Sequence, residues 1–269
     1  MKIRPLQNFI NRIVSPKPTK QVDDNSYFVQ QTMQLNKLNE DVFCKNLPKL
    51  EEELIEIEDL SISRRALIDA AYKHKTEEHP KRIEKYGSNL INPPREVSEE
   101  EFDAINAVQY CHTSYTAVQK KLRNHKALNE EEKKSFEKIL NAMQPTKEEM
   151  IVWRSLTSYE GFIDSINKGY LDLEGFSSTS ACFDDFFAFW GGPGFEVKDN
   201  KTYLKNSYFL KIIIPKNTPI LDCNATYGKL STRLPQEIVL LPAHCTVQDI
   251  DIENKVITLL YKEILEPIQ

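Results

Sequence analysis

The chain has 269 residues, of which 40% are hydrophobic and 28% are charged, and its formal net charge is -5. This length allows one large domain or two small ones, and the composition is ordinary for a soluble globular protein. The acidic balance argues against nonspecific nucleic-acid binding, so no nucleic-acid partner is expected, and no stretch approaches the roughly 20 apolar residues that span a bilayer.

The N-terminus carries early positive charge but lacks the continuous apolar core of a secretory signal. Its apolar residues fall at helical spacing: Leu6, Phe9, Ile10 and Ile13. We expect a short helix that packs on its own domain, or a loose tail, and membrane contact by this helix is the less favoured alternative. Residues 15–25 contain two prolines and little that is apolar, which is typical of a linker.

Helical patterns dominate the first half of the chain. Residues 50–59 place Leu50, Leu54 and Ile57 on one face, which predicts a helix, and residues 63–72 follow as a second helix capped by its serine. Ser98 and Glu101 then predict a capping box at the start of a new helix. Apolar residues at helical spacing mark this helix and two more before Pro145: Phe102, Ile105 and Val108; Tyr115, Val118 and Leu122; Phe136, Ile139 and Leu140.

The second half changes to short apolar runs separated by turn residues, which is typical of strands. These runs cover residues 150–153, 208–214, 237–241 and 255–261. Helices followed by strands predict an α+β fold. The chain contains no G-x-G-x-x-G or Walker-type loop, so a Rossmann or P-loop enzyme is disfavoured.

Cysteine and histidine spacing suggests neither a disulfide framework nor a metal site. The five cysteines are scattered and form no C-x-x-C pair: Cys44, Cys111, Cys182, Cys223 and Cys245. We therefore expect free thiols in a reducing compartment. The five histidines show no ligand spacing, and no metal is expected.

Three places in the second half carry candidate chemistry. Arg154 follows the first apolar run, so it is expected at a strand end facing a cleft, although such an arginine is more often a salt-bridging residue. The run Ser178-Thr179-Ser180 either forms a polar turn or orients a neighbouring acid by short hydrogen bonds. Glu237 is the first residue of an apolar run. Its carboxylate lies either in solvent at the edge of a sheet or in a position that serves a function.

The order of these pieces resembles the arginine–serine–glutamate class of mono-ADP-ribosyltransferases, which includes many bacterial toxins and effectors. The resemblance spans about residues 98–262. The first pattern is a tyrosine followed by N-x-x-L-R-like residues: Tyr115, Gln119, Leu122 and Arg123, with Gln119 where the family usually has Asn. The aromatic-Arg segment Val152–Leu156 and the F-x-STS-like segment Phe176–Ser180 follow, with Phe189 as a downstream aromatic. The last two patterns are the strand Leu210–Thr218 and the segment Leu230–Pro242, which bears Glu237.

The resemblance implies a helical N-terminal part followed by a two-sheet mixed β core, with an NAD cleft between the sheets. It divides the chain into an N-terminal tail and linker (1–25), a helical region (26–95) and an ADP-ribosyltransferase domain (96–269). NAD would be the co-substrate, with no metal. The implied catalytic residues are Glu237, Arg154 and Ser178. The implied NAD contacts are Arg154, Ser155, Arg123, Tyr115, Gln119, Ser178, Thr179 and Phe189.

The implied reaction transfers ADP-ribose from NAD to a side chain of an unidentified protein in a host cell, after delivery into the host cytosol by a route without a conventional signal. One departure concerns the acceptor: Pro235 stands two residues before Glu237, where the family usually has Glu or Gln. Gln236 is adjacent to Glu237, and adjacent side chains on a strand point to opposite faces. Two alternatives therefore stay open: an NAD glycohydrolase, and a catalytically silent binding module on the same fold.

Overall fold

The computed structural model describes residues 3–5, 47–51, 54–57, 79–87, 95–183, 194–205, 207–226 and 236–265. The helices are α4 (His79–Tyr86), α5 (Glu99–Gln109), α6 (Thr113–Arg123), α7 (Glu130–Ala142) and α8 (Phe162–Asn167), with one 3-10 turn, η1 (Cys223–Thr226). The strands are β1 (Ile3–Pro5), β2 (Leu54–Ile57), β3 (Gln144–Pro145), β4 (Met150–Thr157), β5 (Tyr170–Leu173), β6 (Ser177–Ser180), β7 (Phe195–Lys198), β8 (Lys201–Lys205), β9 (Ser207–Ile214), β10 (Pro219–Asp222), β11 (Glu237–Leu240), β12 (Ala243–Asp251) and β13 (Val256–Leu265).

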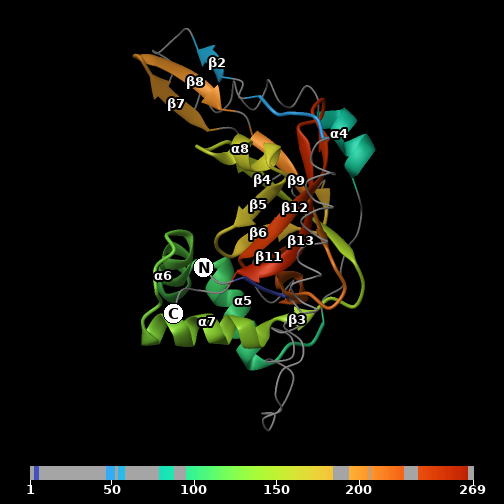
Figure 1. Ribbon diagram of the computed structural model, residues 1–269. Helices are drawn as coiled ribbons and strands as arrows, with labels where there is room; N and C mark the ends of the chain where they lie inside the picture. The colour runs from blue at the N-terminus through green and yellow to red at the C-terminus, as the bar shows by residue number, and fades with distance from the viewer. Residues whose placement is uncertain are drawn as a thin grey trace, which may run out of the picture.

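These strands form one large mixed sheet and one small sheet, which confirms the predicted α+β class. Nine strands of the large sheet follow the order β3-β10-β11-β6-β4-β9-β13-β12-β5, and β1 adds to β13. The β9–β13 pair is parallel, and the other recorded pairs are antiparallel. The small sheet, β2-β8-β7, lies at the opposite end of the molecule from helices α5, α6 and α7 (Figure 1).

The large sheet is nearly divided in two between β4 and β6. These strands pair at one position, Trp153 with Ser180, whereas β4 and β9 pair from Met150 to Thr157. The sequence suggested two β sheets around a cleft, and the structure instead joins the two halves at this single residue pair.

Helices α5, α6 and α7 form as the sequence predicts, and residues on their apolar faces are buried. The capping box predicted for α5 is only half formed. The Ser98 hydroxyl accepts from the Glu101 backbone amide at 3.1 Å, but the Glu101 carboxylate binds the Arg95 guanidinium instead of the Ser98 amide. A charged partner is the stronger one for a buried carboxylate. Among the described residues, no helix is long and apolar enough to cross a membrane.

The predicted helix over residues 50–59 is wrong. Residues Leu54–Ile57 form β2, which pairs with β8 from Lys205 to Thr202. Two β-branched isoleucines favour a strand, and the edge of β8 supplies the hydrogen bonds that a helix would otherwise make internally. Three expected segments lie outside the described residues: the N-terminal helix with Leu6 to Ile13, the linker over residues 15–25 and the helix over residues 63–72. Before residue 15, the structure describes only the short strand β1.

Helix α4 covers the face of β4 that points away from Arg154. The Tyr86 ring packs edge-on against Trp153 at 5.4 Å between centroids. Its hydroxyl donates to Asp251 Oδ2 at 2.6 Å, and Lys85 Nζ reaches the same oxygen at 2.6 Å. Burial opposes ionisation of Asp251, but hydrogen bonds from Lys85, Tyr86 and Asn254 outweigh it and hold its pKa below the usual 3.8. One ionised carboxylate thus holds the helix to the β12–β13 turn, together with a bond from Arg82 Nε to the Asn254 carbonyl at 2.9 Å.

Asp251→Asn is therefore expected to lower the free energy of unfolding at pH 7 by about 1.5–3 kcal/mol, the contribution of hydrogen bonds to a charged group. A depressed folded pKa stabilises the protein above the unfolded value and loses its effect as pH falls. The difference between wild type and variant should shrink as pH falls below 3.8. Urea unfolding across pH measures this, with the exposed Asp249→Asn on the same strand as control.

Candidate active site

Arg154 lies in the middle of β4, and not at a strand end as predicted. The strand continues through Thr157 because residues 155–157 keep pairing with β9. Val152 belongs to the main hydrophobic core and Leu156 packs against it. Since alternate residues share a face, the Arg154 side chain points to that same side. Arg154 Nη1 donates to the Ser178 carbonyl at 3.1 Å, which connects the two halves of the sheet.

The serine–threonine–serine run forms strand β6, and its three hydroxyls act differently. Ser178 donates from Oγ to Glu237 Oε1 on the neighbouring strand β11. Thr179 donates from Oγ1 to the Ile238 carbonyl at 2.6 Å, which ties β6 to β11. Ser180 bonds the Cys182 backbone. Ser178 is thus the residue of the run that orients the acid, while Thr179 and Ser180 stabilise the backbone around it.

Glu237 begins strand β11, as the sequence predicts, and is only 7% exposed. Two donors from different elements hold its carboxylate. Ser178 binds Oε1, and Gln109, the last residue of α5, donates from Nε2 to Oε2 at 3.2 Å. A buried carboxylate with a donor on each oxygen is held in a defined orientation, and it keeps acceptor positions for a further hydroxyl.

Two guanidinium groups, those of Arg154 and Arg123, lie near each other, and Arg154 binds the carbonyl of the same Ser178 that holds this carboxylate. Burial and the nearby Arg123 together lower the pKa of Arg154 to about 10, so Arg154 stays charged at neutral pH. Burial is also the main cause that raises the pKa of Tyr115 to about 12, and its further electrostatic interactions with Glu237, Arg123 and Arg154 place the phenol among these groups. Within the described residues, neither arginine forms an ion pair with a carboxylate. Two adjacent unpaired cations favour binding of an anion.

Gln119 and Gly175 fix the loop that leads into β6. Gln119 Nε2 donates to the Phe176 carbonyl at 2.6 Å, and its Oε1 accepts from the Phe176 amide at 2.8 Å. A Cβ on Gly175 would lie 2.8 Å from Gln119 Oε1 and 3.0 Å from Arg123 Cγ, so a side chain there would displace the Gln119 amide from the Phe176 backbone. The Tyr115 ring stacks on Phe176 at 5.7 Å. Gln119 therefore uses its amide on the protein backbone, and its expected contact to NAD stays a prediction.

The remaining expected NAD contacts lie at different places. Ser155 follows Arg154 on β4, so its side chain points to the opposite face, where Trp153 packs. Thr179 is 2% exposed and engaged with Ile238. Phe189 lies outside the described residues. The structure thus gathers Glu237, Ser178, Arg154, Arg123 and Tyr115 at one place.

On the acceptor side, Pro235 lies outside the described residues, but Gln236 is described. Its backbone has φ of 70°, its carbonyl accepts from Ala181 at 2.9 Å, and the residue is 2% exposed. Left-handed backbone is uncommon for residues with a side chain. Gln236 is therefore a buried turn residue at the entry of β11 and does not project into solvent.

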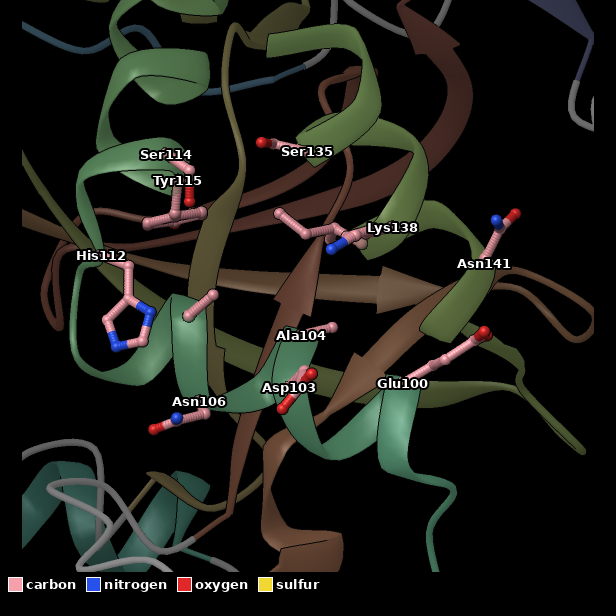
Figure 2. A pocket seen from close by; sticks show the side chains of 12 residues that line it. Glu100, Asp103, Ala104, Asn106, His112, Ser114, Tyr115, Ser135, Lys138 and Asn141 are labelled. Carbon is pink, nitrogen blue, oxygen red and sulfur yellow. The ribbon is translucent and has the colours of Figure 1, made fainter. Parts of the chain in front are cut away.

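A separate pocket of about 450 Å³ lies among helices α5, α6 and α7 (Figure 2). Its polar side chains come from all three helices and include Asp103, Ser114 and Lys138. Tyr115 lines this pocket, whereas Glu237, Ser178 and Arg154 do not. The carboxylate and the arginine pair therefore form a different site.

Comparison with known proteins found no matching family model and no matching curated protein. Solved structures do match. The chain resembles ADP-ribosyltransferase toxins. Plx2a from Paenibacillus larvae matches at 15% identity and a TM-score of 0.42, over 72% of this chain and 95% of that one. Vis from Vibrio splendidus matches at 12% identity and a TM-score of 0.41, over 77% and 89% of the two chains. C3stau2 from S. aureus, solved with NAD, matches at 15% identity and a TM-score of 0.44, over 70% and 94%.

The contacts of the site indicate the chemistry that it suits. Ser178 and Gln109 orient the buried carboxylate, the Ser178 carbonyl binds Arg154, and Arg154 lies near Arg123. A carboxylate can stabilise a developing positive charge on a sugar, and guanidinium groups can bind phosphate oxygens. The arrangement therefore suits a phosphorylated sugar substrate whose bond breaks through a cationic state.

Gln109 is a site residue that the sequence did not predict. The residue lies four positions after the buried Ile105 on α5, so both belong to the helix face that meets the sheet. That spacing was the available signal. What it could not show is that the end of α5 lies beside the first residue of β11, 128 residues later in the chain.

Proposed function

We propose that the protein cleaves NAD and transfers ADP-ribose to a protein side chain, with release of nicotinamide. The observation that carries this proposal is the Glu237 carboxylate, held by Ser178 and Gln109, with Arg154 bound to the carbonyl of the same Ser178 and Arg123 near Arg154. Among the described residues, neither arginine is paired with a carboxylate. NAD presents the two chemical groups that such a site suits, a pyrophosphate and a ribose whose glycosidic bond breaks.

In the proposed reaction, Arg154 and Arg123 bind the pyrophosphate, and Glu237 binds the 2′-hydroxyl of the nicotinamide ribose. The bond between ribose C1′ and the nicotinamide nitrogen breaks, and its electron pair leaves with nicotinamide, which becomes neutral. The ribose carries the positive charge in the transition state, where the Glu237 carboxylate stabilises it. The acceptor atom then forms its bond to C1′ and loses its proton to solvent.

The glycohydrolase alternative uses the same residues with water as the acceptor. The burial of Gln236 supports this alternative, because a buried side chain does not reach an acceptor residue on another protein. The silent binding module is disfavoured, since a module without catalysis has no need for a buried carboxylate with a donor on each oxygen.

Incubation of the purified protein with adenine-labelled NAD and a eukaryotic lysate distinguishes these functions. Transfer predicts labelled protein and free nicotinamide; hydrolysis predicts free ADP-ribose and nicotinamide; a silent module predicts neither. We expect labelled protein, and we expect agmatine, a small arginine mimic, to remain unmodified because Gln236 is buried. Label on agmatine would show that another residue orients an arginine acceptor. Intact NAD in every arm would contradict the proposed function.

We further propose that the acceptor is a host-cell protein and that the enzyme acts in a reducing cytosol. Two cysteines support the second part: Cys111 and Cys245 carry free thiols, and Cys245 is buried. Free buried thiols suit a compartment without oxidising enzymes. Delivery by a route without a conventional signal is proposed from the resemblance to toxins and effectors alone.

A further inference from the structure

Gln109 approaches the candidate catalytic carboxylate from the helical layer. It is the last residue of α5, and its Nε2 donates to Glu237 Oε2 at 3.2 Å. Ser178 already binds the other oxygen from strand β6. The carboxylate is thus held from two sides, by the helices and by the sheet.

Gln109 prevents a rotation of the Glu237 carboxylate that the bond from Ser178 alone would permit. The terminal torsion of a glutamate is broad, so a carboxylate bound at one oxygen can still swing about that contact. A donor on the other oxygen, coming from a different element, defines the plane of the group. Each carboxylate oxygen accepts about two hydrogen bonds, so both retain a position for a substrate hydroxyl.

Burial of the Gln109 side chain also has an energetic cost that no hydrogen bond offsets among the described residues. Its Oε1 is buried and has no hydrogen-bond partner among the described residues. A buried polar group without a partner costs about 1–3 kcal/mol, and a methionine of similar size would avoid that cost. The amide is therefore unfavourable for packing, and the hydrogen bond to Glu237 is what it contributes.

We propose that Gln109 is a positioning residue that fixes the plane of the Glu237 carboxylate for the step that breaks the glycosidic bond. This inference rests on the proposed function, because it gives Glu237 the role stated there. Gln109 itself contacts Glu237 and acts through it. The consequence is that Gln109 affects turnover of NAD and not the binding of NAD.

Gln109→Met removes the donor and keeps the volume. We expect kcat for NAD cleavage to fall by about 10- to 100-fold, the usual effect of a misplaced catalytic group, while the Kd for NAD stays within about twofold. Asn106→Ala, on the same helix, is the matched control and should keep the wild-type kcat. Thermal unfolding of each variant verifies that it folds.

Gln109→Glu gives a signature that a structural role would not produce. Two carboxyl groups this close share one proton at low pH, and a protonated glutamic acid at position 109 can donate to Glu237 as the amide does. The ratio of variant to wild-type kcat should therefore rise as pH is lowered from about 8 to about 6. This variant also serves as the test if Gln109→Met does not fold.

A double-variant cycle completes the test. In a Glu237→Gln background, Gln109→Met should cause little further loss, because its effect acts through the missing carboxylate. A wild-type kcat in Gln109→Met, a ratio that does not change with pH in Gln109→Glu, or fully additive losses in the cycle would each overturn the inference. These outcomes presuppose NAD cleavage by the wild type. No cleavage by the wild type would reject the proposed function and this inference together, whereas cleavage without a Gln109 effect rejects only the inference.

Discussion

Glu237→Gln is expected to lower the turnover of NAD by about 100-fold or more, because it removes one preorganised charge from the site. The substitution keeps the size of the side chain and loses only the negative charge. The ribose becomes positive only in the transition state, so a group that acts on this charge affects kcat far more than NAD affinity. Initial rates of nicotinamide release, together with calorimetry of NAD binding, measure both quantities.

The structure also explains why this variant should fold. The new amide can accept from Ser178, and its NH₂ can donate to Gln109, whose Oε1 is buried without a partner among the described residues. Rotation of the Gln109 amide would present that oxygen. Loss of activity with an unchanged thermal unfolding temperature therefore reports on charge alone. Glu263→Gln, on β13, is the control and should retain full turnover. A Glu237→Gln enzyme of near wild-type rate would remove Glu237 from catalysis.

Four strands of the β half, β4, β9, β11 and β13, could be predicted from the sequence because each contains an apolar run bounded by turn residues. The runs at 208–214, 237–241 and 255–261 correspond to β9, β11 and β13 within a few residues. Strand β4 was predicted too short, since Ser155 and Thr157 are polar. Only their pairing with β9 extends the strand, and partner strands are not visible in a local pattern.

The sequence named Arg154, Ser178 and Glu237 as candidate site residues, but it could not show how they are arranged. The order of Arg154, Ser178 and Glu237 along the chain suggested that they act together, and the hydrogen bonds from Ser178 to Glu237 and from Arg154 to the Ser178 carbonyl are consistent with that. The single-pair junction between β4 and β6 lies beside them and left no signal in the sequence. Gln119 was predicted as an NAD contact, but its amide binds the Phe176 backbone, a contact that the sequence did not indicate.

Arg154→Lys is expected to weaken NAD binding by about 1–3 kcal/mol, which corresponds to roughly 5- to 150-fold in Kd. Lysine keeps the positive charge but replaces the planar fork of donors with a single ammonium group, which cannot bind two phosphate oxygens side by side. The substitution also removes the bond from Nη1 to the Ser178 carbonyl. Calorimetry of NAD binding measures the loss, and Arg95→Lys, at an arginine paired with Glu101, is the control that should bind normally.

The lowered pKa of Arg154 gives this prediction a second consequence. Burial and the neighbouring Arg123 make the charged form of Arg154 costly, and a bound pyrophosphate would relieve that cost. Binding should therefore weaken with added salt, because screening reduces the attraction between the anion and the two cations. The salt dependence should be smaller in Arg123→Gln, which leaves one cation. Salt-independent binding, or a wild-type Kd in Arg154→Lys, would show that NAD is bound without this arginine pair.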